Sequence, residues 1–327
     1  MTESKPRINY LKFFAKLLVS VSILYFCFTS IDLSQLPKFI SRANLLLLFL
    51  AYVLDMIGNI VCPALITKLA LSSQQFSIPL TAIIKINFIV RFYTLFLPSG
   101  ATAGIRWLKY KKYGDSPDAV ALIVFEKLIQ IFLLTATVLV FVVIDYELLG
   151  ASMGTLLICV SVLFLLSVAA LAPFFVSSFS IFLERILDFF KSMLPGFIVR
   201  IAEHLLNAAS KFQSVHYVTV IKIVATAIVG HTFLVMGLYT LSLSLGIGLS
   251  IYAIAWIRAL ALLIMLVPIT VANLGVREGS FMACMKLYDV PGYQAMGFGL
   301  TLTAFQVLNG LFGASFELHD QFIAKAE

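Results

Sequence analysis

VPITVANLGVREGSF, the stretch from Val267 to Phe281, decides how the chain folds, because it places a proline, two glycines and two charges between strongly apolar segments. Pro268 cannot continue a regular helix, since it lacks a backbone N–H and its ring clashes with the preceding turn. Gly275 and Gly279 permit backbone geometry that bulkier residues resist. In a membrane such a break survives only where protein or water satisfies its polar groups. A charged break at membrane depth therefore predicts a functional site.

A second copy of this device lies earlier in the chain, in PSGATAGIR, from Pro98 to Arg106. Both stretches read as proline, small or polar residues, and then Gly-hydrophobic-Arg, which ends at Arg106 in the first and at Arg277 in the second. A weaker likeness links VFEKLIQIF (Val124 to Phe132) with AFQVLNGLF (Ala304 to Phe312), with Phe, Leu and Phe in register. Broken helices in two inverted repeats are typical of transporters.

The composition places the chain among polytopic membrane proteins. Of its 327 residues, 61% are hydrophobic and 12% are charged, which excludes an ordinary soluble domain. The net charge of +7 does not indicate a nucleic-acid partner, because the basic residues flank apolar segments and act as topology signals. The histidines are scattered, and neither an HExxH nor a Walker A motif occurs, so we expect no metal or nucleotide cofactor. Few residues follow the last apolar segment, and we expect no attached catalytic domain.

We predict an all-α polytopic membrane protein, a single integral membrane domain over residues 1–327. Eight apolar segments carry this prediction, at about 11–30, 44–66, 78–97, 118–144, 152–176, 219–245, 251–267 and 294–316. One alternative is eight full transmembrane helices. The other, favoured by the positive-inside tendency, has about six full crossings and two re-entrant or broken-helix elements. It predicts inverted repeats at about 11–145 and 152–317, with an interfacial amphipathic insert at about 179–215.

Topology follows from the second alternative. It places the N-terminus, the Arg106–Lys112 cluster and the amphipathic insert in the cytoplasm, and it places Glu147 and the Gly246–Ser250 turn outside. We expect a multi-pass protein of the cell inner (cytoplasmic) membrane.

Charges inside the apolar segments define the predicted site. A charge at a helix centre costs roughly 2.5–3.5 kcal/mol, so these residues must pair or line an aqueous cavity. The cations outnumber the carboxylates, and arginine binds phosphate through a two-pronged fork, so an anionic lipid headgroup is the expected ligand. The alternative is that the charges only hold helices together or reach to the interface. The predicted substrate-binding residues are Arg91, Arg106, Glu126, Arg258, Asn273, Arg277 and Glu278.

Specific partners are also expected within this set. Glu126 needs a cation, with Arg258 as the first candidate and Arg91 as the second. Arg277 and Glu278 are neighbours on a helix and point about 100° apart, so they should serve different partners. We expect Arg277 to face a central cavity and Glu278 to cap backbone N–H groups or meet a cation. Asp55 is a lone carboxylate that either relays protons or links helices, for example through Asn59.

These residues resemble the flippase-like transmembrane domain family of lysylphosphatidylglycerol synthases. The resemblance rests on LPSGATAGIR, Phe125-Glu126-Lys127-Leu128, Arg258 and GVREG at Gly275 to Gly279, and it extends over about Leu11 to Phe316. It implies a membrane protein that moves lipids between leaflets or assists that step. The synthases add an aminoacyl-transferase domain, so lipid aminoacylation does not carry over. Relatives often have an extra glycine and an acidic residue before the first arginine, where Ala101 to Gly104 stands here.

Three functions remain open at this stage. The first is a flippase or scramblase-like translocator, not an enzyme, for an anionic phospholipid or a polyprenyl-phosphate-linked sugar. The second is a membrane-embedded transferase acting on a lipid phosphate, for which Glu126 and Glu278 are the candidate carboxylates. The third is an accessory subunit of an envelope glycoconjugate pathway. The candidate partners are membrane lipids with an anionic headgroup, a second copy of the chain and an envelope glycosyltransferase.

Overall fold

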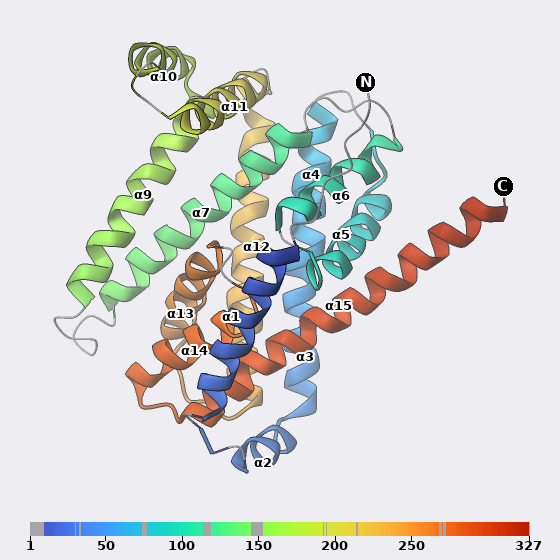
Figure 1. The fold of residues 1–327 in the computed structure, drawn as a ribbon, viewed down its shortest axis with the longest axis vertical. Helices are drawn as coiled ribbons and strands as arrows, with labels where there is room; N and C mark the ends of the chain where they lie inside the picture. The colour runs from blue at the N-terminus through green and yellow to red at the C-terminus, as the bar shows by residue number, and fades with distance from the viewer. Residues whose placement is uncertain are drawn as a thin grey trace.

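The computed structural model confirms an all-helical membrane protein (Figure 1). It describes the chain except residues 1–9, 30, 33, 74–76, 98, 114–118, 145–152, 192, 194, 214, 268–269, 271–272 and 327. No β-strand occurs among the described residues. The two break prolines, Pro98 and Pro268, and the predicted external residue Glu147 lie outside the described residues.

The helices follow the predicted apolar segments closely. Those of the first half are α1 (Tyr10–Thr29), α2 (Gln35–Ser41), α3 (Leu45–Met56), the π-helix η1 (Ile57–Val61), α4 (Cys62–Ser73), α5 (Leu80–Thr94), α6 (Ser99–Lys111) and α7 (Ala119–Ile144). Those of the second half are α9 (Met153–Phe175), α10 (Ser177–Phe190), α11 (Gly196–Gln213), α12 (Tyr217–Ser244), α13 (Ile251–Met265), α14 (Val276–Met285), the 3-10 turn η2 (Lys286–Tyr288) and α15 (Gly292–Ala326). The last helix extends ten residues beyond the predicted end at 316.

Helix length separates full crossings from broken elements. Five helices in the described part of the chain are long and apolar enough to cross a membrane: Leu45–Ser72, Ile123–Ile144, Gly154–Phe175, Tyr217–Ser244 and Gly292–Phe322. The 20-residue α1 matches the sixth predicted crossing. By contrast α5 and α13 have 15 residues each. At 1.5 Å per residue each is about 22 Å long, short of the roughly 30 Å hydrocarbon core. These lengths favour re-entrant elements over eight full crossings.

The two broken elements lie in opposite halves of the molecule. In the view of Figure 1, α5 and α6 are in the upper half, whereas α13 and α14 are in the lower half. The last crossing helix of each half packs against the broken element of the other half: α15 packs along α5, and α7 packs along α13. The order crossing, broken element, crossing thus occurs twice with opposite orientation, as the inverted-repeat arrangement requires.

The central crossings of the two halves meet at a pair of glycines. A Cβ atom on Gly58 would lie 2.5 Å from the side chain of Leu234 and 2.9 Å from the carbonyl oxygen of Gly230. A Cβ atom on Gly230 would lie 2.8 Å from the side chain of Cys62. Leu234, one helical turn after Gly230, packs against Gly58, and Cys62, one turn after Gly58, packs against Gly230. The missing side chains of the two glycines thus allow α3–α4 and α12 to approach closely.

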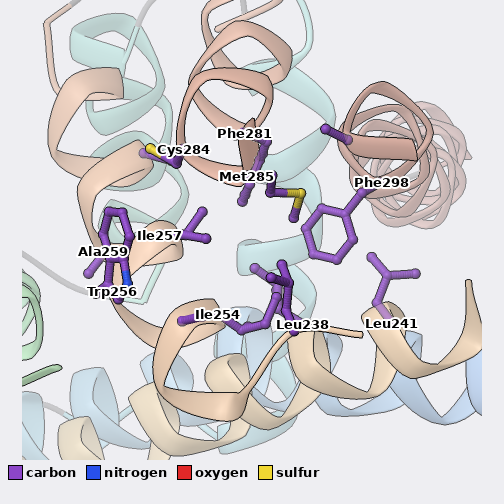
Figure 2. Close-up of a cluster of buried hydrophobic side chains, with 14 of the residues drawn as sticks. Leu238, Leu241, Ile254, Trp256, Ile257, Ala259, Phe281, Cys284, Met285 and Phe298 are labelled. Atoms are coloured by element: carbon purple, nitrogen blue, oxygen red, sulfur yellow. The ribbon is translucent and has the colours of Figure 1, made fainter. Parts of the chain in front are cut away.

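Apolar packing fixes the second broken element against its neighbours. Figure 2 shows this core, in which side chains from α12, α13, α14 and α15 interdigitate. Trp256 is fully buried, and its indole N–H donates to the hydroxyl of Tyr288 at 2.7 Å. The helices on both sides of the break, α13 and α14, are therefore held in place by close packing.

The predicted amphipathic insert consists of two helices, α10 and α11, which lie together at the upper end of the molecule (Figure 1). Lys191 and Glu203 form an ion pair between them at 2.8 Å. Phe182, Phe189 and Met193 are exposed on this pair. Exposed aromatic side chains beside surface charges suit the boundary between membrane and water.

Candidate functional site

A tight turn precedes α14 within the second broken element. Asn273 (φ 60°) and Gly275 (φ 83°) both adopt positive φ values just before α14. Glu278 reaches back from the first turn of α14, and its Oε2 accepts the backbone N–H of Gly275 at 2.8 Å. This is the capping role predicted for Glu278, whose side chain is 0% exposed. Asn273 contributes its backbone, because its carbonyl accepts the N–H of Arg277 at 3.1 Å.

Arg277 binds the last helix and not an open cavity. Its Nη1 donates to Thr303 Oγ1 at 3.0 Å, and its Nη2 donates to Gln306 Oε1 at 2.7 Å. Thr303 in turn donates to Glu278 Oε1 at 2.8 Å. Arg277 and Glu278 thus have different direct partners, as expected, and Thr303 bridges them. In this conformation the Arg277 residue is 4% exposed, so its predicted access to a central cavity is wrong for this state.

The first broken element makes the matching contact with a charged partner. Arg106 on α6 lies beside Glu126 on α7, with Nη1 and Oε2 3.1 Å apart. Thr67 on α4 donates to the other carboxylate oxygen at 2.8 Å. Glu126 therefore has an arginine partner, but the expected pairing with Arg258 or Arg91 was wrong. The physical reason is local, because α6 returns alongside α7 and places Arg106 nearest to the carboxylate.

Arg91 is held by the π-helix η1. Its Nη2 donates to both the backbone carbonyl and the side-chain oxygen of Asn59, at 3.2 and 3.1 Å. A π turn wraps the backbone more widely than an α turn, and such turns are frequent at functional sites. Asn59 also donates its Nδ2 to Asp55 Oδ1 at 2.9 Å. The interpretation of Asp55 as a partner of Asn59 is confirmed by this bond.

Arg258 is held by a histidine that the sequence did not single out as functional. Its Nη1 lies 3.3 Å from His231 Nδ1. Arginine carries only donors, so Nδ1 is the acceptor and the ring proton sits on Nε2. Nε2 then donates to Thr137 Oγ1 at 2.8 Å, and that hydroxyl donates to the carbonyl of Leu133 at 2.6 Å. The network thereby assigns a neutral His231 that positions Arg258, which is 5% exposed.

Asp55 is the carboxylate shared by both halves. It is 7% exposed, and it interacts electrostatically with Arg91, Arg258 and Arg277. Sequence reasoning left it outside the predicted site because it stands alone in its apolar segment. The available signal was the four-residue spacing to Asn59, which puts both polar groups on one face of the helix.

The two halves repeat the same pair of arginine contacts. In each half the arginine of the Gly-x-Arg motif contacts the residue that follows the first aligned phenylalanine, which is Phe125 or Phe305. Arg106 contacts Glu126, and Arg277 contacts Gln306. The second arginine of each half contacts the residue that follows Gly58 or Gly230, the two glycines at which the crossing helices meet. Arg91 contacts Asn59, and Arg258 contacts His231. Five of the predicted residues, Arg91, Arg106, Glu126, Arg258 and Arg277, are therefore brought into one repeated arrangement. The register is not strictly repeated, since Arg91 lies near the end of α5 and Arg258 lies mid-way along α13.

Ion pairs also tie the last helix to the first broken element. Lys109 on α6 pairs with Glu317 on α15, and Lys85 on α5 pairs with Asp320. Tyr93 donates to Glu317 Oε1 at 3.3 Å. These contacts join the two halves at one end of the molecule, so any rearrangement of the halves has to break them.

The chain matches one protein-family model over most of its length. The family is described as the lysylphosphatidylglycerol synthase TM region, and the match covers residues 13–313. No curated protein and no solved structure matches the chain. In the described part of the chain no group of three or more His, Cys, Asp or Glu side chains could hold a metal ion.

Proposed function

Because the chain belongs to the lysylphosphatidylglycerol synthase transmembrane-region family, a family of membrane proteins that act on lipids, we propose that it moves an anionic lipid between the two leaflets. The substrate class is an anionic phospholipid or a polyprenyl-phosphate-linked sugar. The proposed role is non-enzymatic, since translocation changes the position of the headgroup and not its bonds.

A single observation carries this proposal: arginines outnumber carboxylates among the buried and half-buried charges where the two halves meet. The four arginines are Arg91, Arg106, Arg258 and Arg277, and the three carboxylates are Asp55, Glu126 and Glu278. This set has one net positive charge, which one phosphodiester, with its single negative charge, would neutralise. A buried charge is costly unless it is paired, so an anion that completes this set is bound favourably.

The partners of the arginines make them available to such an anion. Within the described part of the chain, Arg91, Arg258 and Arg277 donate hydrogen bonds only to uncharged groups. Replacing a neutral acceptor by a phosphate oxygen strengthens the interaction, because the negative charge adds Coulomb attraction to a hydrogen bond that the guanidinium already donates. Only Arg106 is already committed to a carboxylate, Glu126. The headgroup is therefore expected to exchange with Asn59, His231, Gln306 or Thr303, and the ion pair is expected to remain as a structural support.

The inverted repeat supplies the movement. Two broken elements that enter from opposite sides can each open one side of a common site while the other stays closed. In this conformation Lys109–Glu317 and Lys85–Asp320 tie α15 to α6 and α5 at one end of the molecule. Opening that end requires both ion pairs to separate.

Reconstitution into liposomes tests the proposal. A fluorescent phosphatidylglycerol in the inner leaflet becomes accessible to an external reductant only after it is moved. We expect movement with the wild-type chain and loss of movement with Arg277→Gln, while Arg185→Gln, at an exposed position on α10, behaves as wild type. A new lipid product would support the transferase instead. Inactivity of a folded wild-type chain toward phosphatidylglycerol and polyprenyl phosphate sugars alike would refute autonomous translocation and leave the accessory role.

A further inference from the structure

A basic cavity lies at the end of the molecule opposite α10 and α11, where α2 covers the end of α12 and the start of α15 (Figure 1). Its volume is about 540 Å³. We refer to it as the α2 cavity, and its polar lining includes Gln35, Lys38, Arg42, Asn44, Tyr293 and Gln294. None of its lining residues is acidic. We propose that the α2 cavity binds the phosphate of an anionic lipid headgroup at this face of the membrane.

The two cations of the cavity are free to bind an anion. Lys38 and Arg42 are four residues apart, both are exposed, and neither forms an ion pair among the described residues. Asp32 interacts electrostatically with Lys38. However, its carboxylate oxygens are already occupied, since they accept hydrogen bonds from the N–H and hydroxyl of Ser34 and from the side-chain amide of Gln35. An ammonium and a guanidinium therefore line the cavity, and no side chain in the described part of the chain accepts a hydrogen bond from them.

The walls of the cavity are fixed before any ligand binds. Asn44 N–H donates to the carbonyl of Ser244 at 2.9 Å, and the Ser244 hydroxyl donates back to the carbonyl of Asn44 at 3.0 Å. On the other side, Phe39 lies against α15, where a Cβ atom on Gly297 would come within 2.9 Å of its ring. Phe39 also meets the ring of Tyr293 edge-on at 5.8 Å. A preorganised site loses little entropy on binding, which raises affinity for a small charged group.

The predicted side of the membrane adds a second argument. The sequence places the Gly246–Ser250 turn outside, and Gly246 lines the cavity. Under the positive-inside tendency, external loops carry few lysines and arginines. Lys38 and Arg42 run against that tendency, so topology does not account for them. Binding of a lipid headgroup that approaches or leaves the translocation site on the outer side explains why Lys38 and Arg42 are there. In this respect the inference rests on the proposed function.

Lipid retention tests the site. The purified chain in neutral detergent is given equal amounts of phosphatidylglycerol and phosphatidylcholine, and native mass spectrometry counts each bound lipid. Wild type should prefer phosphatidylglycerol, and Lys38→Gln/Arg42→Gln should reduce that preference by about tenfold, since two charge-assisted bonds are lost. A matched control, Lys222→Gln/Lys286→Gln, removes two exposed charges outside the cavity and should retain the preference. Lys38→Arg/Arg42→Lys keeps both charges and should also retain it.

A competition experiment distinguishes a lipid headgroup from free phosphate as the ligand. Inorganic phosphate that displaces the lipid at comparable concentration identifies free phosphate as a ligand of the same site, whereas displacement only by phosphatidylglycerol identifies the lipid. Equal preference in all four proteins overturns the site. The proposed function fails separately: a wild type that retains phosphatidylglycerol through Lys38 and Arg42 but moves no lipid in liposomes overturns translocation and leaves the site. Translocation with retention that ignores both charges overturns the site alone.

Discussion

Gln306 occupies the position in the second half that Glu126 occupies in the first, and this difference can be removed by one substitution. Gln306→Glu places a carboxylate against Arg277, where the amide oxygen now lies 2.7 Å from Nη2. The new ion pair neutralises the single excess positive charge of the buried set. Folding should suffer little, because the attraction of the Arg277 guanidinium offsets much of the cost of burying the new carboxylate.

Transport should suffer strongly. A carboxylate about 6 Å from a bound phosphate repels it by roughly 3 kcal/mol at an effective dielectric constant near 20. That corresponds to roughly a 100-fold loss of affinity for the headgroup. The assay compares movement of fluorescent phosphatidylglycerol in liposomes with the thermal unfolding midpoint of the same preparation. Gln306→Asn is the control, since it shortens the side chain without adding charge. A Gln306→Glu chain that unfolds like wild type and moves phosphatidylglycerol at the wild-type rate refutes the charge argument.

Sequence reasoning placed the helices and both breaks because those features are local. A run of apolar residues sets the length of a crossing, and a Pro…Gly-x-Arg stretch interrupts it wherever it occurs. The capping role of Glu278 was equally local, since it concerns a backbone N–H three residues away. None of these inferences needs knowledge of which helices are neighbours in space.

Pairings between helices were the part that failed, and Glu126 shows why. A carboxylate in an apolar segment needs a cation as its partner. However, Arg91, Arg106 and Arg258 all lie in or beside the broken elements, and spacing along the chain did not rank them. The repeat alignment puts Glu126 in register with Gln306 and Arg106 in register with Arg277, but it does not show that either pair is in contact. The structure joins these residues in the same way in both halves. Once one of these contacts is known, internal symmetry therefore predicts the other.

His231 and Asp55 were missed for a different reason. His231 has no charged partner in its own sequence neighbourhood, so the expectation of packing alone outweighs that of function. Asp55 has Asn59 four residues away, but that bond predicts a link within one helix and not its interaction with three arginines. The π-helix at Ile57–Val61 has no sequence marker of its own, yet it sets the position of Asn59 and hence of Arg91. Long-range contacts of this kind become visible only when the crossing helices are assembled.

Three further predictions test the architecture itself. A cysteine at Lys109 should be labelled only from the cytoplasmic side and one at Glu147 only from outside; external labelling of Lys109→Cys contradicts the inverted repeats. Gly230→Leu should abolish stable expression, because even its Cβ would lie 2.8 Å from Cys62, whereas an exposed glycine such as Gly104, with open space around it, should tolerate alanine in the same expression assay. Glu126→Gln should lower the stability of the chain by about 2–3 kcal/mol, below the usual 3–5 kcal/mol for a broken buried pair. The side chains of Arg106 and Glu126 are 22% and 15% exposed, and the amide can still accept one hydrogen bond, which is why the loss is reduced. Adding Arg106→Gln should recover part of that loss in thermal unfolding, since it removes the cation left without a counter-charge. A double variant less stable than Glu126→Gln alone would show that Arg106 is held by something other than this carboxylate.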